Sequence, residues 1–374
     1  MDYPMLVNKH DELTVVYGGQ WGSEGKGQII AAITNEQHGP FFAVRVGGPN
    51  AGHTARDFTR RWVKAQQLPV PCFTNPNAIG VIGCSGVILP EVLERELERF
   101  DQLRHTEQGA WPKLLIDNQA MVISQEMLSA EESLKKAIGS TGEGVGAATA
   151  AKVMRTGQTF LDWLNNRPMR TRLSELVERN CTFADTVTVL NRHGDTPKCF
   201  IEGTQGYLLS LNTSRFYPYC TSRDCGPEAL MGQVGVSPRS YHAAKIIAVF
   251  RTYPIRVGGN SGGLPGEITW DHLRELSGGY VVTPERTTVT NRIRRIATWD
   301  TETVQAVCAE TRPTGLAITF LDYLFPECAK LQGIDGGLSP RARLWLRKVE
   351  NLVGAPVEWV STGPGQEYSL RVRL

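Results

Sequence analysis

The chain has 374 residues, of which 41% are apolar and 21% charged, a composition typical of a globular protein of one large domain or two ordinary ones. Its 40 basic and 38 acidic residues are interleaved and leave a net charge of +2, so no basic tract indicates a protein that binds nucleic acid or a membrane surface. The eight cysteines are scattered without a C-x-x-C pair, which excludes the usual zinc-site and disulfide patterns.

The N-terminal segment 1–12 is polar and predicts a flexible extension rather than a secretory signal. No apolar run approaches the length of a membrane span. We therefore expect a cytoplasmic protein.

The next stretch predicts a strand, a phosphate-binding loop and a helix. Thr14–Tyr17 is a short β-branched run, Gly18–Gly27 contains five glycines and Lys26, and Gln28–Ile33 has the character of a helix start. Backbone N–H groups of such a loop can surround an anion, and the helix N-terminus behind them adds a favourable dipole. Lys26 would then place a positive charge on the β- and γ-phosphates of a nucleotide.

This loop departs from the Walker pattern of P-loop NTPases. Five residues separate Gly19 from Gly25, and Gly27 stands where Ser or Thr should hold magnesium. An ordinary P-loop NTPase is therefore a poor interpretation, and a glycine-rich turn without a ligand stays open from these residues alone.

The run Gly-Gly-Gln-Trp-Gly-Ser-Glu-Gly-Lys-Gly from residue 18 closely resembles the opening signature of adenylosuccinate synthetases. The resemblance implies a P-loop-like α/β fold whose mostly parallel central sheet has helices on both faces. Ser23 replaces the aspartate that the family uses as its catalytic base and as a magnesium ligand, and it would lie against the purine. The residues implied to bind the triphosphate are Gly22, Glu24, Gly25, Lys26 and Gly27.

A second strand, Phe41–Val46, ends in the loop Gly-Gly-Pro-Asn-Ala-Gly-His-Thr from residue 47. In open α/β folds such loops lie at the carboxyl edge of the sheet, where ligands bind. His53 can serve there as a general acid or hydrogen-bond donor to a transferring phosphoryl group, and a surface histidine is the simpler alternative. The family has a similar loop, except at Pro49. It implies that Asn50 contacts the purine nucleotide, that Gly52 joins Ser23 at magnesium, and that Gly52, His53 and Thr54 contact the triphosphate.

Three further elements carry no chemistry of their own. We expect a buried strand with its turns over Ala78–Leu89, a helix with a solvated charged face over Glu91–Arg104, and a strand over Leu114–Asn118.

A second glycine cluster spans Ile138–Gly146, and its hydroxyls and bare backbone suit a monophosphate. A similar segment in the family holds the 5′-phosphate of the nucleotide substrate, which implies this role for Ser140 and Thr141. Glu143 stands where the family has an arginine. Arg155 matches the arginine that reaches the substrate phosphate of the neighbouring subunit, and a solvated helix arginine is the alternative.

The segments from Phe200 to Ser210 and from Tyr217 to Ser222 also resemble family blocks. They place Gln205 at the glutamine that contacts the purine 6-substituent and Thr221 at a substrate-phosphate threonine. A buried glutamine with purely structural hydrogen bonds is the commoner fate of such a residue. The apolar stretch Ile246–Phe250 matches the family in spacing but carries little chemistry.

Thr287–Ile296 concentrates three arginines after a β-type segment, and guanidinium forks bind carboxylates bidentately. The loop therefore suits an amino acid with two carboxylates, with a solvated basic patch as the alternative. The family binds aspartate with a Thr-Gly-Arg-x-Arg-Arg loop, in which Asn291 replaces the glycine here. The matching residues are Thr290, Arg292, Arg294 and Arg295.

Leu316–Leu324 predicts a late core strand that ends in a base-recognition loop. The family reads Thr-Lys-Leu-Asp at this place, so Phe320 replaces the lysine of a guanine-reading motif while Asp322 is kept. The later run Trp359–Pro364 matches the loop that flanks the nucleotide base, which implies triphosphate-binding roles for Ser361, Gly363 and Pro364.

The matching segments run in the family's order from residue 14 to residue 364, so we expect one adenylosuccinate-synthetase-like α/β domain over residues 1–374. The resemblance implies a homodimer in which Arg155 acts in trans. It also implies a reaction in which a nucleoside triphosphate phosphorylates the purine 6-oxygen before the aspartate amine displaces phosphate. Ser23, Lys26, His53 and Gln205 are the implied catalytic residues, and Mg²⁺ is the implied cofactor.

The departure at Ser23 is shared by a phage branch of the family that makes 2-aminoadenine for DNA. That branch implies dGMP, ATP or dATP, and L-aspartate as substrates, 2-amino-2′-deoxy-N6-succinyladenylate as product, and the host cytoplasm as location. A neutral hydroxyl cannot serve as the base, so the N1 proton must pass to water, phosphate or another group such as Glu24.

Two other functions stay open. One is a conventional adenylosuccinate synthetase that uses IMP and GTP. The other is an inactive purine-nucleotide sensor, which the missing base suggests, although a sensor would not need the aspartate-binding arginines.

Overall fold

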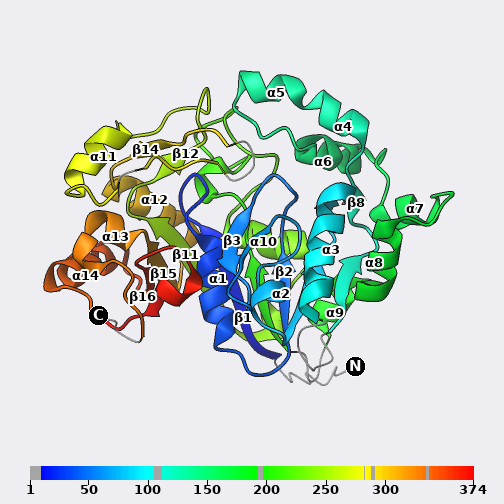
Figure 1. The fold of residues 1–374 in the computed structure, drawn as a ribbon, viewed down its shortest axis with the longest axis horizontal. Coiled ribbons are helices and arrows are strands. Elements are labelled where there is room, and N and C mark those ends of the chain that lie inside the picture. Colours follow the sequence, from blue (N-terminus) through cyan, green and yellow to red (C-terminus); the bar gives the residue numbers. More distant parts are fainter. Residues whose placement is uncertain (1–9, 105–111, 193–196, 282, 288–290, 334–336) are drawn as a thin grey trace, which may run out of the picture.

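The computed structural model describes residues 10–104, 112–192, 197–281, 283–287, 291–333 and 337–374. Its centre is a ten-stranded sheet in which every neighbouring pair is parallel except the antiparallel pair at one edge (Figure 1). In spatial order the strands are β17 (Ser369–Arg371), β16 (Val357–Ser361), β15 (Gly315–Thr319), β11 (Tyr241–Arg251), β1 (His10–Gly18), β10 (Lys198–Glu202), β2 (Phe41–Arg45), β5 (Ala78–Ile82), β7 (Leu114–Asp117) and β9 (Cys181–Ala184).

Side chains that alternate along the central strands build a separate core on each face of the sheet. Val16 belongs to one core, with Ile29 and Ile30 of α1 (Lys26–Asn35). Its neighbours Val15 and Tyr17 belong to the other core. Because consecutive strand residues point to opposite faces, helices are needed on both sides to cover them. The prediction of a mostly parallel sheet with helices on both faces is confirmed.

The helices form one layer on each face of the sheet and a further group at its carboxyl edge. The first face is covered by α1, α2 (Pro71–Thr74), α3 (Pro90–Arg104) and α8 (Arg172–Asn180), and the second by α9 (Thr186–Asn191), α10 (Pro227–Val234), α12 (Thr301–Thr311) and α14 (Pro340–Val353). At the carboxyl edge of the sheet lie α4 (Gln125–Ala130), α5 (Glu132–Ala137) and α6 (Val145–Met154) on one side and α11 (Trp270–Leu276) on the other (Figure 1). The remaining helices are α7 (Phe160–Asn165) and α13 (Leu321–Leu324).

Three small sheets frame the same edge. They consist of β12 (Ile255–Arg256), β14 (Arg295–Ala297) and β13 (Glu267–Ile268); of β3 (His53–Arg56) and β4 (Trp62–Ala65); and of β6 (Val87–Ile88) and β8 (Met121–Val122). Among the described residues, no helix is both long and apolar enough to cross a membrane.

The predicted strands and the long helix all form. Most boundaries shift by one or two residues, but β1 begins four residues before the predicted Thr14, and the segment Ala78–Leu89 contains the two strands β5 and β6. The helix expected over residues 91–104 begins one residue earlier, because Pro90 is favourable at a first helical position. Residues 10–12 belong to strand β1 and not to the flexible extension predicted over residues 1–12. His10 and Glu12 pair with β11 as part of β1, and residues 1–9 lie outside the described part of the chain.

Candidate functional site

The glycine loop between β1 and α1 is held from inside by Glu24. One carboxylate oxygen of Glu24 accepts hydrogen bonds from the backbone N–H groups of Gly22 (2.7 Å) and Gln20 (3.2 Å). The other oxygen pairs with Lys26 Nζ at 2.6 Å, and Lys26 also donates to the carbonyl of Gln205. An ammonium group has three protons, so one remains for a ligand. Glu24 is fully buried, and we infer that it shapes the loop rather than accepts a proton from a substrate.

His53 occupies the space that the Ser or Thr side chain of a Walker motif would need at residue 27. A Cβ atom at Gly27 would lie 2.7 Å from the Cβ of His53, which is closer than van der Waals contact allows. Any side chain at residue 27 would therefore push His53 away from the loop. The loop and the histidine are packed as one unit.

A buried charge pair orients His53. The Nδ1 atom of His53 lies 2.5 Å from a carboxylate oxygen of Glu202, to which Arg45 also donates, and Arg45 Nη1 lies 2.9 Å from the same Nδ1. Burial and the charge of Arg45 lower the pKa of His53 to about 4. Burial alone would raise the pKa of Glu202, but Arg45 and His53 hold it below its usual value. The imidazole is therefore neutral at pH 7, with its Nδ1 proton donated to Glu202 and Nε2 free to face a ligand.

Ser23 lies between two arginines. Its backbone has a φ of 59°, which exposes the side chain at the corner of the loop. The hydroxyl accepts a hydrogen bond from Arg294, and the Ser23 carbonyl accepts one from Arg251 at 3.3 Å. Ser23, Lys26, His53 and Arg294 line one cavity of about 270 Å³, which we name the loop groove. The same groove contains Gly25, Gly27, Gly52 and Thr54.

A second cavity of about 540 Å³, which we name the aromatic pocket, lies beside the loop groove and shares Thr54 and Phe320 with it. Asp322 lines this pocket, and one of its oxygens accepts a hydrogen bond from the Tyr280 hydroxyl at 2.8 Å. Its other oxygen is buried and has no hydrogen-bond partner among the described residues. Buried acceptors are normally paired, so this oxygen is suited to an N–H group of a ligand. Burial raises the pKa of Asp322. The pocket also contains Ser361, Gly363 and Pro364.

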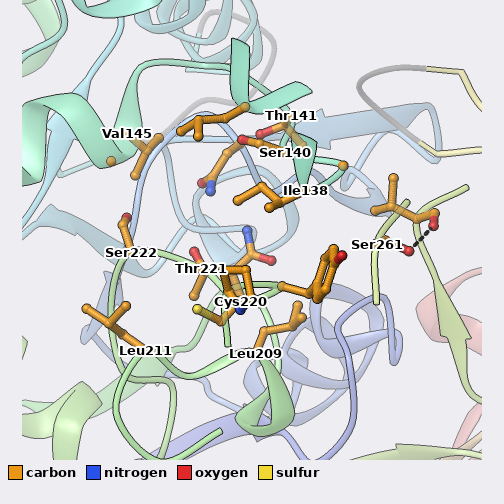
Figure 2. A pocket seen from close by; sticks show the side chains of 18 of the residues that line it. Ile138, Ser140, Thr141, Val145, Leu209, Leu211, Cys220, Thr221, Ser222 and Ser261 are labelled. Atoms are coloured by element: carbon orange, nitrogen blue, oxygen red, sulfur yellow. Dashed lines mark hydrogen bonds between the residues drawn. The ribbon is translucent and has the colours of Figure 1, made fainter. Parts of the chain in front are cut away.

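A third cavity of about 380 Å³, the hydroxyl pocket, lies between the second glycine cluster and residues 217–222. Figure 2 shows Ser140 and Thr141 on one side of it and Thr221 across from them. Asn50 and Gln205 also line it, and a smaller cavity of about 100 Å³ joins it to Ser23 and Lys26. The structure thus brings these predicted purine-nucleotide residues together in one cavity.

Arg155 is not among the residues that line the hydroxyl pocket. It is exposed just beyond the end of α6, in a left-handed conformation with a φ of 60°. Its neighbours Val153 and Met154 are each 69% exposed, which is unusual for apolar side chains.

The three described arginines of the predicted aspartate loop differ in direction. Arg294 faces the loop groove, where burial together with the nearby charge of Arg251 lowers its pKa to about 10. Arg295 points away and pairs with Glu267. Arg292 is exposed and does not line the groove, and Thr290 lies outside the described residues.

Among the charged residues of this site that the sequence did not single out are Arg45, Glu202 and Arg251. Each is the last residue of a parallel strand, in β2, β10 and β11 respectively. A charged residue that closes an apolar β-run is a usable signal, because the carboxyl ends of parallel strands meet at the ligand-binding edge. Ile246–Phe250 carries no charge, and Arg251 directly follows it.

We predict that His53 titrates with a midpoint near pH 4, well below the ordinary histidine value of 6.5. Because folding favours the neutral imidazole, the free energy of unfolding should decrease as the pH falls from 6.5 toward 4. An NMR titration of the histidine ring protons, assigned with His53→Asn, measures the midpoint. A midpoint near 6.5 would show that the Glu202–Arg45 environment is not formed in solution.

The adenylosuccinate synthetase family model matches residues 15–188 and 180–334. The chain is 34% identical to the adenylosuccinate synthetase of Methanococcus vannielii over 96% of this chain and 98% of that protein, and 32% identical to that of Methanocaldococcus jannaschii over 96% of each.

Two solved structures share the fold. The succinoaminodeoxyadenylate synthetase of cyanophage S-2L, bound to dGMP and dATP, superposes with a TM-score of 0.76 at 25% identity, over 97% of this chain and 96% of that one. The Plasmodium falciparum adenylosuccinate synthetase superposes with a TM-score of 0.74 at 19% identity, over 96% and 99% of the two chains. The family-model match and the identity with the Methanococcus vannielii protein over nearly the whole chain show that the chain belongs to the adenylosuccinate synthetase family.

Proposed function

We propose that this family ligase joins L-aspartate to the 6-position of dGMP at the expense of ATP or dATP. The products are 2-amino-2′-deoxy-N6-succinyladenylate, ADP or dADP, and phosphate. The observation that carries the proposal is the neutral Ser23 at the junction of the loop groove and the hydroxyl pocket. A carboxylate reaching for the purine N1 would occupy the space that the 2-amino group of guanine needs, whereas a serine hydroxyl is shorter and can accept a hydrogen bond from that group. The phage enzyme bound to dGMP and dATP supports this choice.

The reaction proceeds in two displacements. The purine 6-oxygen attacks the γ-phosphorus of the donor, an O–P bond forms, and the nucleoside diphosphate leaves as the N1 proton passes to water. The neutral aspartate amine then attacks C6, phosphate leaves with the 6-oxygen, and the amine loses one proton to the departing phosphate. The purine 6-oxygen is a poor leaving group, and its phosphorylation replaces one difficult step with two easier ones.

The residues take distinct roles in these steps. Lys26 and the loop N–H groups stabilise charge on the transferring phosphoryl group, and the Gln205 side chain holds the 6-oxygen. His53 is neutral in the free protein, and the arriving triphosphate raises its pKa, so that Nε2 gains a proton to donate. Arg294 binds an aspartate carboxylate, with Arg292 and Thr290 as proposed further contacts. Arg295 forms an ion pair with Glu267 and stabilises the loop.

Magnesium fits this site only with phosphate oxygens as its main ligands. Among the described residues there is no cluster of three or more His, Cys, Asp or Glu side chains. The two residues proposed as protein ligands, Ser23 and Gly52, both line the loop groove. Mg²⁺ commonly combines few protein ligands with substrate phosphates and water, so this sparse donor set is compatible with it. Bound there, the ion would neutralise phosphate charge.

The donor base is proposed to occupy the aromatic pocket. Asp322 offers its unpaired oxygen to the exocyclic amine of adenine, and Phe320 supplies an apolar wall in place of the family's lysine. One face of the Phe320 ring is covered by Arg251, so the base contacts the remaining face or the edge.

Purine selection is tested by incubating the protein with aspartate, Mg²⁺ and each pairing of IMP, GMP or dGMP with ATP, dATP or GTP. We expect a succinylated product by mass from dGMP with ATP or dATP, and turnover with GTP lower by about tenfold or more. Efficient use of IMP while dGMP is inert would assign a conventional synthetase. Nucleotide binding without phosphate release from any pair would assign a sensor.

Substitutions at Ser23 distinguish the effect of a negative charge at residue 23 from the effect of side-chain size. Ser23→Ala should cost about 1–3 kcal/mol of transition-state stabilisation with dGMP. Ser23→Asp should abolish dGMP turnover and shift activity toward IMP, and its carboxylate should raise the KM for aspartate by pairing with Arg294. Ser23→Asn is the matched control, since it has the size of Asp without the charge. Equal effects of Asn and Asp on the aspartate KM would contradict the ion pair with Arg294.

We also propose a homodimer in which Arg155 completes the hydroxyl pocket of the neighbouring subunit. Its position outside the pocket and the exposed Val153 and Met154 beside it support this. Arg155→Ala and Lys26→Ala should each be nearly inactive alone. Mixed after partial denaturation and refolding, they should regain about a quarter of the unmodified activity, because half of the dimers are mixed and each has one complete site. No recovery in refolded mixed dimers would exclude action in trans.

A further inference from the structure

Arg251 is a fully buried cation for which the proposed reaction has no direct use. It ends β11, at the centre of the sheet beside β1. Its main chain is clamped by the Gln20 side chain, which accepts from the Arg251 N–H at 2.9 Å and donates to the Arg251 carbonyl at 3.2 Å. Burying a guanidinium is costly unless its donors are paired, so its partners identify what it stabilises.

The guanidinium joins the glycine loop to the segment that carries Arg294. It donates to both carboxylate oxygens of Glu285, at 2.6 and 3.2 Å, and to the carbonyl of Ser23 at 3.3 Å. The backbone carbonyl of Glu285 in turn accepts a hydrogen bond from the Arg294 N–H at 2.9 Å. Arg251 therefore contacts Ser23 directly and is linked to Arg294 through Glu285.

The guanidinium also packs on the ring of Phe320, which is a wall of the aromatic pocket. Its central carbon lies 3.7 Å from the centre of the Phe320 ring, within the range of a strong cation–π contact. Tyr323, whose ring meets Phe320 edge-on, donates its hydroxyl to Glu285 at 3.1 Å. A lysine at residue 320, as in the family motif, would place a second positive charge near this guanidinium. The phenyl ring removes that charge and covers the buried cation.

We propose that Arg251 is a positioning residue that fixes Ser23 and the Glu285–Arg294 segment relative to the donor-base wall. It contacts Ser23, Glu285 and Phe320 but lines none of the four cavities described above. The planar fork is essential, because a lysine ammonium can keep the charge but not the simultaneous bidentate, carbonyl and ring contacts. Donor-base contact at Phe320 and aspartate binding at Arg294 thus depend on one buried group. The naming of these ligands depends on the proposed function, whereas the positioning itself does not.

The test is Arg251→Lys, assayed by phosphate release with whichever nucleotide pair the unmodified protein turns over. This choice keeps the test valid if dGMP is rejected. We expect the KM for aspartate to rise by about tenfold or more and kcat to fall, while the KM for the purine monophosphate changes less than about twofold. Arg99→Lys is the matched control, since Arg99 also pairs with a buried carboxylate, Asp57, away from the cavities. It should leave all three constants unchanged.

Glu285→Gln is a second test that can be used if Arg251→Lys folds poorly, because Glu285 is partly exposed. It should raise the aspartate KM to a similar extent. If Arg251 acts through Glu285, the double variant should be no worse than Glu285→Gln alone. Additive effects on the aspartate KM, or a uniform loss of kcat with every KM unchanged, would overturn the positioning role.

Discussion

The parallel pairing of β1 between β10 and β11 is the constraint on which the site depends. Because these strands run in the same direction, their last residues emerge side by side at one edge. The glycine loop follows β1, Glu202 and Gln205 come at or after the end of β10, and Arg251 ends β11. Residues separated by more than two hundred positions in the sequence are thereby placed within hydrogen-bond distance, as in the contact of Arg251 with Ser23.

Charge balance at this edge explains where an anion can bind. Three carboxylates, of which Glu24 and Glu202 are buried and Glu285 is partly exposed, are matched by neighbouring cations: Glu24 by Lys26, Glu202 by Arg45, and Glu285 by Arg251. Arg294 lines the same groove and has no ion-pair partner among the described residues. An isolated, half-buried guanidinium is a ready partner for a ligand carboxylate or phosphate. The matched pairs hold the frame, and the unmatched arginine is available to the substrate.

The sequence predicts several strands of the central sheet and the two glycine clusters, and most of the site residues that it names line the cavities, because a glycine loop that follows a β-run is a local signal of backbone geometry. It does not distinguish Arg294 from Arg295, because adjacent arginines look alike in the sequence; in the structure Arg294 contacts Ser23, whereas Arg295, the first residue of β14, pairs with Glu267. Nor does it reveal the Asp322–Tyr280 contact or the cover of Arg251 by Phe320. These depend on the packing of segments that are remote in sequence, for which no local pattern exists.

The contact between Ser23 and Arg294 gives the serine a consequence beyond the loss of a base. A carboxylate at residue 23 would face the same guanidinium and form an ion pair, which is stronger than the hydrogen bond of a neutral hydroxyl. In the proposed reaction, substrate aspartate would then have to compete with a residue of the protein for Arg294. With serine the arginine keeps its full positive charge for the ligand, at the cost of a general base. If the proposed roles hold, the one substitution changes the chemistry at the purine and the electrostatics of the amino-acid site together.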